Sequence, residues 1–230
     1  MTNIAYHFTG RTLRDGQPIP PIGETLVYDG PLVMSIHPLD ALRHAPGPLL
    51  HRVQLSGKIL TTDKLCAYER TIIASIEATD LLRRFACWCA LRVIRYWTAS
   101  SVVREYLNTE CEELREAAWK AAVKAETAAW VAEWAAEEEA WVVAEAEAAV
   151  WEAGAMAWAA GAAAWAATWA VGAAVWAAAE AAEAEAWAAA RVAWEMGSAE
   201  EARVAAEVAR VAAKASQREK FAEMVRGAFS

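Results

Sequence analysis

The sequence predicts an α+β protein, in which a small β-rich N-terminal domain precedes a mainly helical region rich in alanine and tryptophan. Turn sequences containing glycine and proline interrupt the first 77 residues, whereas no proline occurs beyond residue 111. Alanine, the residue with the highest helix propensity, fills 36 of the 70 positions from 121 to 190. We therefore expect a β-rich domain over 1–77, linking helices packed on it over 78–110, and a helical region over 111–230.

Short runs of β-branched and aromatic residues alternate with turns in the N-terminal domain. A short helix should begin at Pro38 and end near His44, because proline suits a first helical turn and Leu39 and Leu42 follow at helical spacing. The remaining runs predict five strands, at residues 4–8, 25–28, 32–36, 49–55 and 71–76.

The apolar spacing changes to that of a helix after residue 78, with a break at 98–101. Capping boxes at Ser198 and Ser216, each with a glutamate three residues later, predict two further helix starts. The span 112–196 is then either one long helix or a hairpin that folds back near Gly154 or Gly161. A long helix, a hairpin and a coiled-coil-like bundle all fit this pattern.

Charge is distributed unevenly along the chain. The first 110 residues hold 12 basic and 10 acidic side chains, and the rest hold 10 basic and 20 acidic ones. No lysine or arginine occurs from 125 to 190. Because phosphate backbones would be repelled there, we expect no nucleic acid at the helical region.

The four cysteines predict a reduced, cytoplasmic protein, since no apolar leader precedes them. Cys87 and Cys89 lie two residues apart on an expected helix and face different sides, and no histidine nearby in the sequence completes a zinc site. We therefore expect no metal and no cofactor.

Eight tryptophans form a stripe in the helical region. Their successive gaps of 4, 7, 10, 7, 7, 4 and 7 residues place them on the a and d positions of one heptad frame. Small residues occupy most of the remaining a and d positions, so a facing helix could fill the spaces between indoles. The stripe comprises Trp130, Trp134, Trp141, Trp151, Trp158, Trp165, Trp169 and Trp176.

Three interpretations of the stripe compete. The first is helix packing within a hairpin, a bundle or a homo-oligomer. The second is a membrane span over the uncharged residues 153–179, against which stand the weak insertion tendency of alanine and the even spread of indoles. The third is a platform of indoles for a flat or cationic ligand, such as a signalling nucleotide.

A resemblance to a family is carried by residues 28–32, 37–47, 50–57 and 63–70, followed by Phe85-Ala86 and tandem Ala-Ala-Trp units. These segments resemble an uncharacterised bacterial and phage protein family with a β-rich N-terminal domain and Ala/Trp-rich helical repeats. The family has a histidine before its Pro-Leu-Asp-Ala-Leu run, and alignment on Pro38 puts Val33 at that position, with His37 as the candidate replacement. The resemblance implies the fold arrangement and a phage or mobile-element setting, without an established activity.

No nucleophile, metal or phosphate-loop motif occurs in the chain. The polar candidates are His37, Lys64, Glu69 and Arg70, of which Glu69 and Arg70 should point to opposite faces of a strand. We therefore expect a non-enzymatic interaction or sequestering protein that forms a homo-oligomer through the stripe and acts on a host or defence component. The alternatives are a sponge for a small signalling molecule and a nucleotide-processing enzyme of the ADP-ribosyl-transferring kind.

Overall fold

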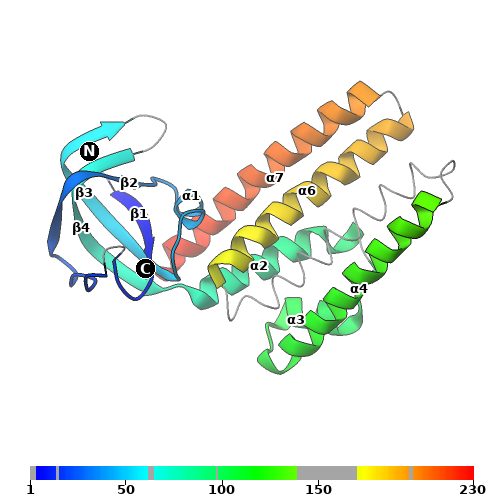
Figure 1. Cartoon of the computed structure of the whole chain (residues 1–230), viewed down its shortest axis with the longest axis horizontal. Coiled ribbons are helices and arrows are strands. Elements are labelled where there is room, and N and C mark those ends of the chain that lie inside the picture. Colours follow the sequence, from blue (N-terminus) through cyan, green and yellow to red (C-terminus); the bar gives the residue numbers. More distant parts are fainter. Residues whose placement is uncertain (1–3, 14–15, 62–64, 97, 139–169, 197–198) are drawn as a thin grey trace. The chain divides into compact units, whose positions relative to one another are not determined.

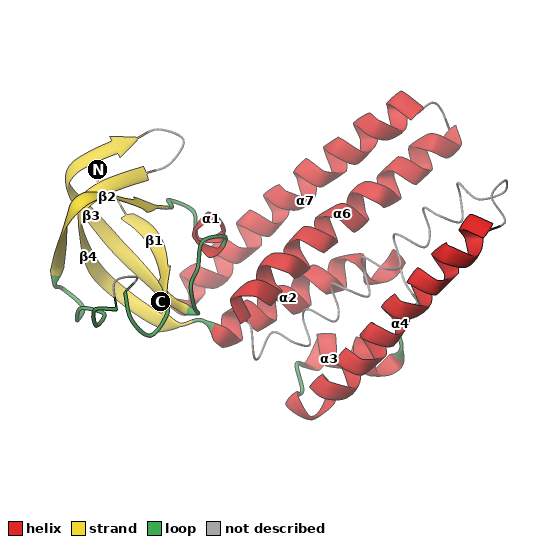
Figure 2. Cartoon of the chain, viewed as in Figure 1, coloured by secondary structure: helices red, strands yellow, loops and turns green. Residues whose placement is uncertain are grey.

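The computed structural model describes residues 4–13, 16–61, 65–96, 98–138, 170–196 and 199–230 (Figure 1). It confirms the α+β class, because an antiparallel four-stranded sheet is followed by a mostly helical region (Figure 2). The strands are β1 (Ile4–Thr9), β2 (Thr25–Met34), β3 (Leu49–Thr61) and β4 (Leu65–Glu77), and the helical elements are α1 (Pro38–Leu42), α2 (Thr79–Val93), the 3-10 turn η1 (Ile94–Tyr96), α3 (Ser101–Thr109), α4 (Glu112–Glu138), α6 (Ala170–Met196) and α7 (Ala199–Ala228).

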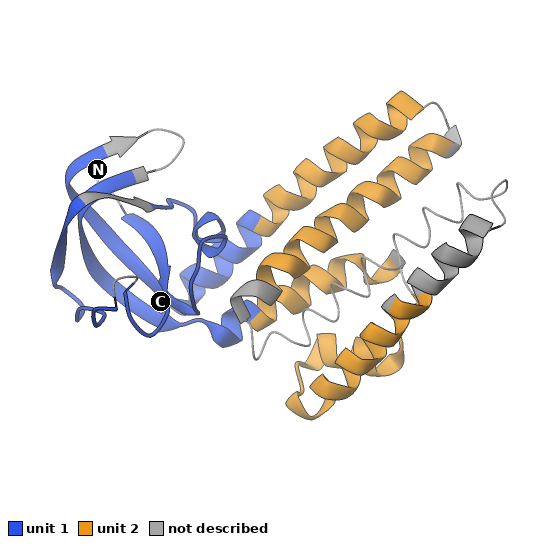
Figure 3. Cartoon of the chain, in the orientation of Figure 1, with its two compact units in different colours: residues 1–82, 218–230 blue, residues 83–217 orange. Residues whose placement is uncertain are grey.

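The chain divides into two units, which Figure 3 shows in different colours. The β unit comprises residues 1–82 and 218–230, and the helical unit comprises residues 83–217. Both boundaries fall inside helices, α2 and α7, so neither unit is a continuous stretch of sequence.

The sheet of the β unit closes on itself. Its strand order is β1-β3-β4-β2, and every neighbouring pair is antiparallel. Tyr6 in β1 then exchanges backbone hydrogen bonds with Ser35, the residue after β2, at 2.8 and 3.4 Å. The two outer strands are thereby joined, and the sheet forms a small barrel.

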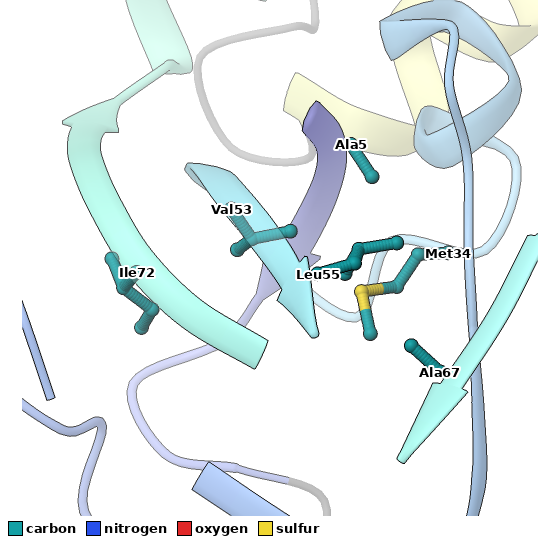
Figure 4. Close-up of a cluster of buried hydrophobic side chains, with 6 residues drawn as sticks. All are labelled: Ala5, Met34, Val53, Leu55, Ala67 and Ile72. Carbon is teal, nitrogen blue, oxygen red and sulfur yellow. The ribbon is translucent and has the colours of Figure 1, made fainter. Parts of the chain in front are cut away.

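The inner face of this barrel holds the apolar core. The strand register aligns Ala5 with Val53 and Val53 with Ile72, so the three side chains point to one side. Figure 4 shows them gathered with three further buried residues, Met34, Leu55 and Ala67.

The end of α7 completes the outer face of the β unit. Phe221 and Val225, one turn apart, are fully buried. Arg218 forms an ion pair with Asp40 of α1 at 2.9 Å, and Arg52 of β3 lies over the ring of Phe229. The last thirteen residues therefore belong to the N-terminal fold.

The strands expected at 49–55 and 71–76 are longer than predicted, as β3 and β4 show, and two further boundaries are wrong. Residues 25–28 and 32–36 were expected as two strands, but β2 runs through Asp29-Gly30-Pro31, and a register shift between Val27 and Leu32 accommodates this turn-like sequence. The second is at Ser216, which starts no new helix, because α7 is continuous and the hydroxyl of Ser216 instead accepts a hydrogen bond from Arg92.

The helical unit is held together by polar contacts between its elements. Arg92 of α2 donates to both carboxylate oxygens of Glu185 in α6, at 2.8 and 3.1 Å. In α7, Arg210 pairs with Glu183 and the side chain of Gln217 donates to the carbonyl of Ala178. Later residues of α7 contact earlier residues of α6, so the two helices are antiparallel, as Figure 1 shows.

The path between α4 and α6 lies outside the described residues, and so do Gly154 and Gly161 as bend candidates. The break expected at 98–101 is confirmed, since α3 begins at Ser101. Among the helices that the structure describes, none is long and apolar enough to cross a bilayer.

Candidate functional site

Helix α6 has two faces of opposite character. Trp187 lies eleven residues after Trp176, and Trp194 seven residues after that. At about 100° per residue the three indoles fall within about 20° of one line along the helix. Their exposed fractions are 52%, 47% and 56%. We call this surface of Trp176, Trp187 and Trp194 the tryptophan face.

Alanines line the opposite, buried side of α6. Their short side chains let neighbouring helices approach closely, which is how a helix of such composition can pack without large apolar groups. The buried alanines are Ala174, Ala177, Ala178, Ala181, Ala182, Ala184, Ala186 and Ala188. In this helix, therefore, alanine makes the core and tryptophan faces outward.

The predicted stripe is described at one side chain only, that of Trp176. Trp130 and Trp134 lie on α4, where only the backbone is described. The stripe members outside the described residues are Trp141, Trp151, Trp158, Trp165 and Trp169. Trp187 and Trp194 were missed because they leave the a and d frame, although their spacing to Trp176 identifies the shared face.

An ion pair borders the tryptophan face. Glu183 lies on the same side of α6 as Trp176 and Trp187, and Arg210 of α7 donates to both of its oxygens, at 2.9 and 3.2 Å. Arg210 also pairs with Glu207 of its own helix. The acidic charge found along α6 in the sequence is thus partly neutralised by basic residues from α2 and α7.

A second polar constellation lies inside the barrel of the β unit. His51 is 1% exposed and points to the same side as Val53. Its Nε2 lies 2.8 Å from Thr9 Oγ1 and its Nδ1 lies 2.7 Å from Ser75 Oγ. Burial, and secondarily the charge of Arg70, lower the pKa of His51 to about 4. The imidazole is therefore neutral at pH 7, with both nitrogens occupied.

This arrangement does not suit acid–base catalysis. A general base must reach a substrate proton, whereas His51 is closed off from solvent and both of its hydrogen bonds are internal. The row Thr9–His51–Ser75 instead connects β1, β3 and β4 across the inner face.

Arg70 lies on the same inner face, level with Leu55 and Leu26. It is 2% exposed, and its guanidinium sits 5.3 Å from the ring centre of Tyr28. Its Nε and Nη1 have no hydrogen-bond partner among the described residues. Burial lowers the pKa of Arg70, and Tyr28 opposes that effect.

The remaining polar candidates have separate roles. His37 caps α1, because its Nδ1 accepts from the backbone N–H of Leu39 at 3.2 Å, which confirms its interpretation as a helix-start residue. Glu69 accepts a hydrogen bond from Ser56 at 2.9 Å, on the other side of β4 from Arg70. Lys64 lies outside the described residues. The structure therefore does not bring these candidates together.

The cysteines are inert packing groups where they are buried. Burial raises the pKa of Cys87 to about 12 and raises that of Cys89 further. In the part of the chain that the structure describes, no group of three or more His, Cys, Asp or Glu side chains could hold a metal ion.

Comparisons of the chain with protein-family models, with curated proteins and with solved structures found no match.

Proposed function

We propose that the protein is a non-enzymatic interaction protein that self-associates through the tryptophan face of α6. One observation carries the proposal: three large indoles are half exposed on one side of a helix whose opposite side is buried. Tryptophan is the residue most enriched at the centres of protein interfaces, where it supplies much of the binding energy.

The size of the face supports an interface. A fully covered indole buries about 150–250 Å², so three half-exposed ones leave roughly 300 Å² open. The largest apolar patch on a monomeric protein is typically about 300–600 Å², and such patches are often functional. The three indoles alone supply more than a third of the roughly 800 Å² that each partner buries in a standard interface.

The spacing of the indoles favours a second copy of the chain as the partner. Trp176 and Trp194 each lie nine residues from Glu185. A two-fold axis at that level would pair α6 with its copy in antiparallel fashion and place Trp176 opposite Trp194 at both ends. The two copies of Trp187 would then lie about 6 Å apart along the axis, in the centre.

The face lacks the excess of positive charge that a nucleic-acid site needs. Glu180 and Glu183 lie beside the indoles, and the positive charges near them, Arg191 of α6 and Arg210 of α7, do not outnumber these carboxylates. A second copy of the chain, unlike a nucleic acid, does not place phosphate groups against Glu180 and Glu183. The resemblance to phage proteins is the reason to look for a further partner, to be sequestered by the dimer, among host or defence components.

Sedimentation or light scattering of the purified chain tests the proposal. The wild type is expected to be a dimer, and Trp187→Glu a monomer with unchanged helical content by circular dichroism. Burying a tryptophan at an interface centre is commonly worth about 2 kcal/mol or more, which amounts to at least a 30-fold weakening. The matched control is Val208→Glu, an exposed position on α7, which should leave the dimer intact. A wild type that stays monomeric at high concentration would refute self-association.

A further inference from the structure

We infer that the inner face of the β unit binds a small oxyanion, a phosphate or a carboxylate group, against the guanidinium of Arg70. The inference is independent of the tryptophan face, because it concerns the other unit. It rests on a buried positive charge for which the described residues provide no counter-ion.

The burial of Arg70 is nearly complete, at 2% exposure. A buried charge is strongly disfavoured unless it is paired and hydrogen-bonded, and arginine does not escape by losing its proton. No carboxylate of a described residue forms an ion pair with Arg70. The nearest one in sequence, Glu69, belongs to the opposite side of β4 and accepts from Ser56.

The neighbours of Arg70 hold it in place without neutralising it. The ring of Tyr28 lies over the guanidinium, which is a cation–π contact. His51, on the same inner face, is neutral and uses both nitrogens on Thr9 and Ser75. Arg70 is therefore fixed in position while its Nε and Nη1 remain without a described acceptor.

The chemistry of these donors selects an oxyanion. Guanidinium N–H groups match the oxygens of phosphate and carboxylate in spacing and charge, whereas a water would satisfy an N–H and leave the charge unpaired. The apolar residues beside Arg70 on the inner face, Leu26 and Leu55, offer no further polar contact, so the group should be small and carry a single charged head.

The test uses the full chain purified in chloride buffer free of phosphate and carboxylates. Released anions are first identified by ion chromatography after denaturation, and a near-stoichiometric oxyanion is expected if exchange is slow. Thermal unfolding is then measured with phosphate, acetate or chloride at constant ionic strength. One of the two oxyanions should raise the midpoint saturably by about 5 °C, and chloride should not. The oxyanion that raises the unfolding midpoint, phosphate or acetate, shows whether the bound group is a phosphate or a carboxylate.

Variants assign the effect to the site. Arg70→Met should abolish the oxyanion-dependent shift, whereas Arg52→Met, an arginine of the same barrel on the outer face, should keep it. If Arg70→Met does not fold, Arg70→Lys retains the charge without the planar donors and should bind at least 10-fold more weakly. The inference is overturned if the wild type releases no anion and shows no shift, or if the Arg70 variants respond as the wild type does.

Discussion

The β unit and helix α6 of the helical unit differ in the side chains that they bury. The β unit buries large side chains such as Phe8 and Phe221, and also encloses a histidine and an arginine. The helical unit buries alanines along α6 and leaves three tryptophans half exposed. Burial of large apolar area is the main source of stability. In the β unit, therefore, large side chains form the core, whereas in α6 the core consists of alanine and the largest apolar groups lie on the exposed side.

Among the variants that test this comparison, Phe221→Ala should lower the free energy of unfolding most. Phe221 lies in α7 but is fully buried in the β unit. Removing a buried phenylalanine leaves a cavity and costs about 3–5 kcal/mol of the free energy of unfolding. Val211→Ala, an exposed position on the same helix, should cost less than about 0.5 kcal/mol in the same urea titration. Equal losses in the two variants would mean that the C-terminal residues are not part of the β core.

The next effect is a loss of stability in acid through His51. Its pKa is about 4 in the folded state and 6.5 in the unfolded chain, so the folded state favours the neutral imidazole. Stability is therefore full above pH 6.5, falls by about 3 kcal/mol as the pH drops from 6.5 to 4, and levels off below that. Thr9 and Ser75 can accept from both nitrogens of the protonated ring, so burial and the charge of Arg70 cause the loss, not broken hydrogen bonds.

His51→Gln separates this contribution from the other titrating groups. Glutamine can replace the two hydrogen bonds but takes up no proton. Urea titrations from pH 7 to 4 should therefore show a shallower fall for the variant, by about 3 kcal/mol in total. Parallel curves for variant and wild type would exclude the buried neutral histidine as the acid-sensitive group.

The close alanine packing of α6 predicts that a larger side chain on its buried side lowers the free energy of unfolding, by less than the two changes above. Ala181 is buried, so Ala181→Leu should force the helices apart and cost about 1–3 kcal/mol. Ala179, two residues away, is exposed, and Ala179→Leu should be nearly neutral. Thermal unfolding of the two variants checks which side of α6 is the core. A reversed order would mean that the tryptophan face, and not the alanine face, packs within the chain.

Local signals were enough to predict much of the fold from the sequence. Proline at Pro38 and the side chain of His37 are sufficient to begin α1, and the change of apolar period after residue 78 marks α2. The failures have tertiary causes. A capping signal at Ser216 is outweighed by the burial and bonding of α7, and Asp29-Gly30-Pro31 is absorbed by a register shift.

The candidate sites were predicted less well, because they depend on pairing. Arg70 was among the polar candidates from the sequence. That it has no counter-ion among the described residues follows only from the structure, in which the strand register puts Glu69 on the other face of β4. The heptad frame selected Trp176 and missed Trp187 and Trp194, because those two residues do not fall on its a and d positions. Small residues were expected between packed indoles, whereas in α6 buried alanines form the side away from them.

The smallest effect on folding should come from the tryptophan face itself. Trp194 is 56% exposed, so Trp194→Ala removes few contacts within the chain and should change the free energy of unfolding of the monomer by less than about 1 kcal/mol. At concentrations where the dimer forms, the same variant should unfold at a clearly lower temperature than the wild type, because association stabilises the folded state by mass action. The measurement is the unfolding midpoint of both chains across a 100-fold dilution. A gap between them that stays constant on dilution would assign Trp194 to the core of its own chain, whereas a gap that closes assigns its binding energy to a partner.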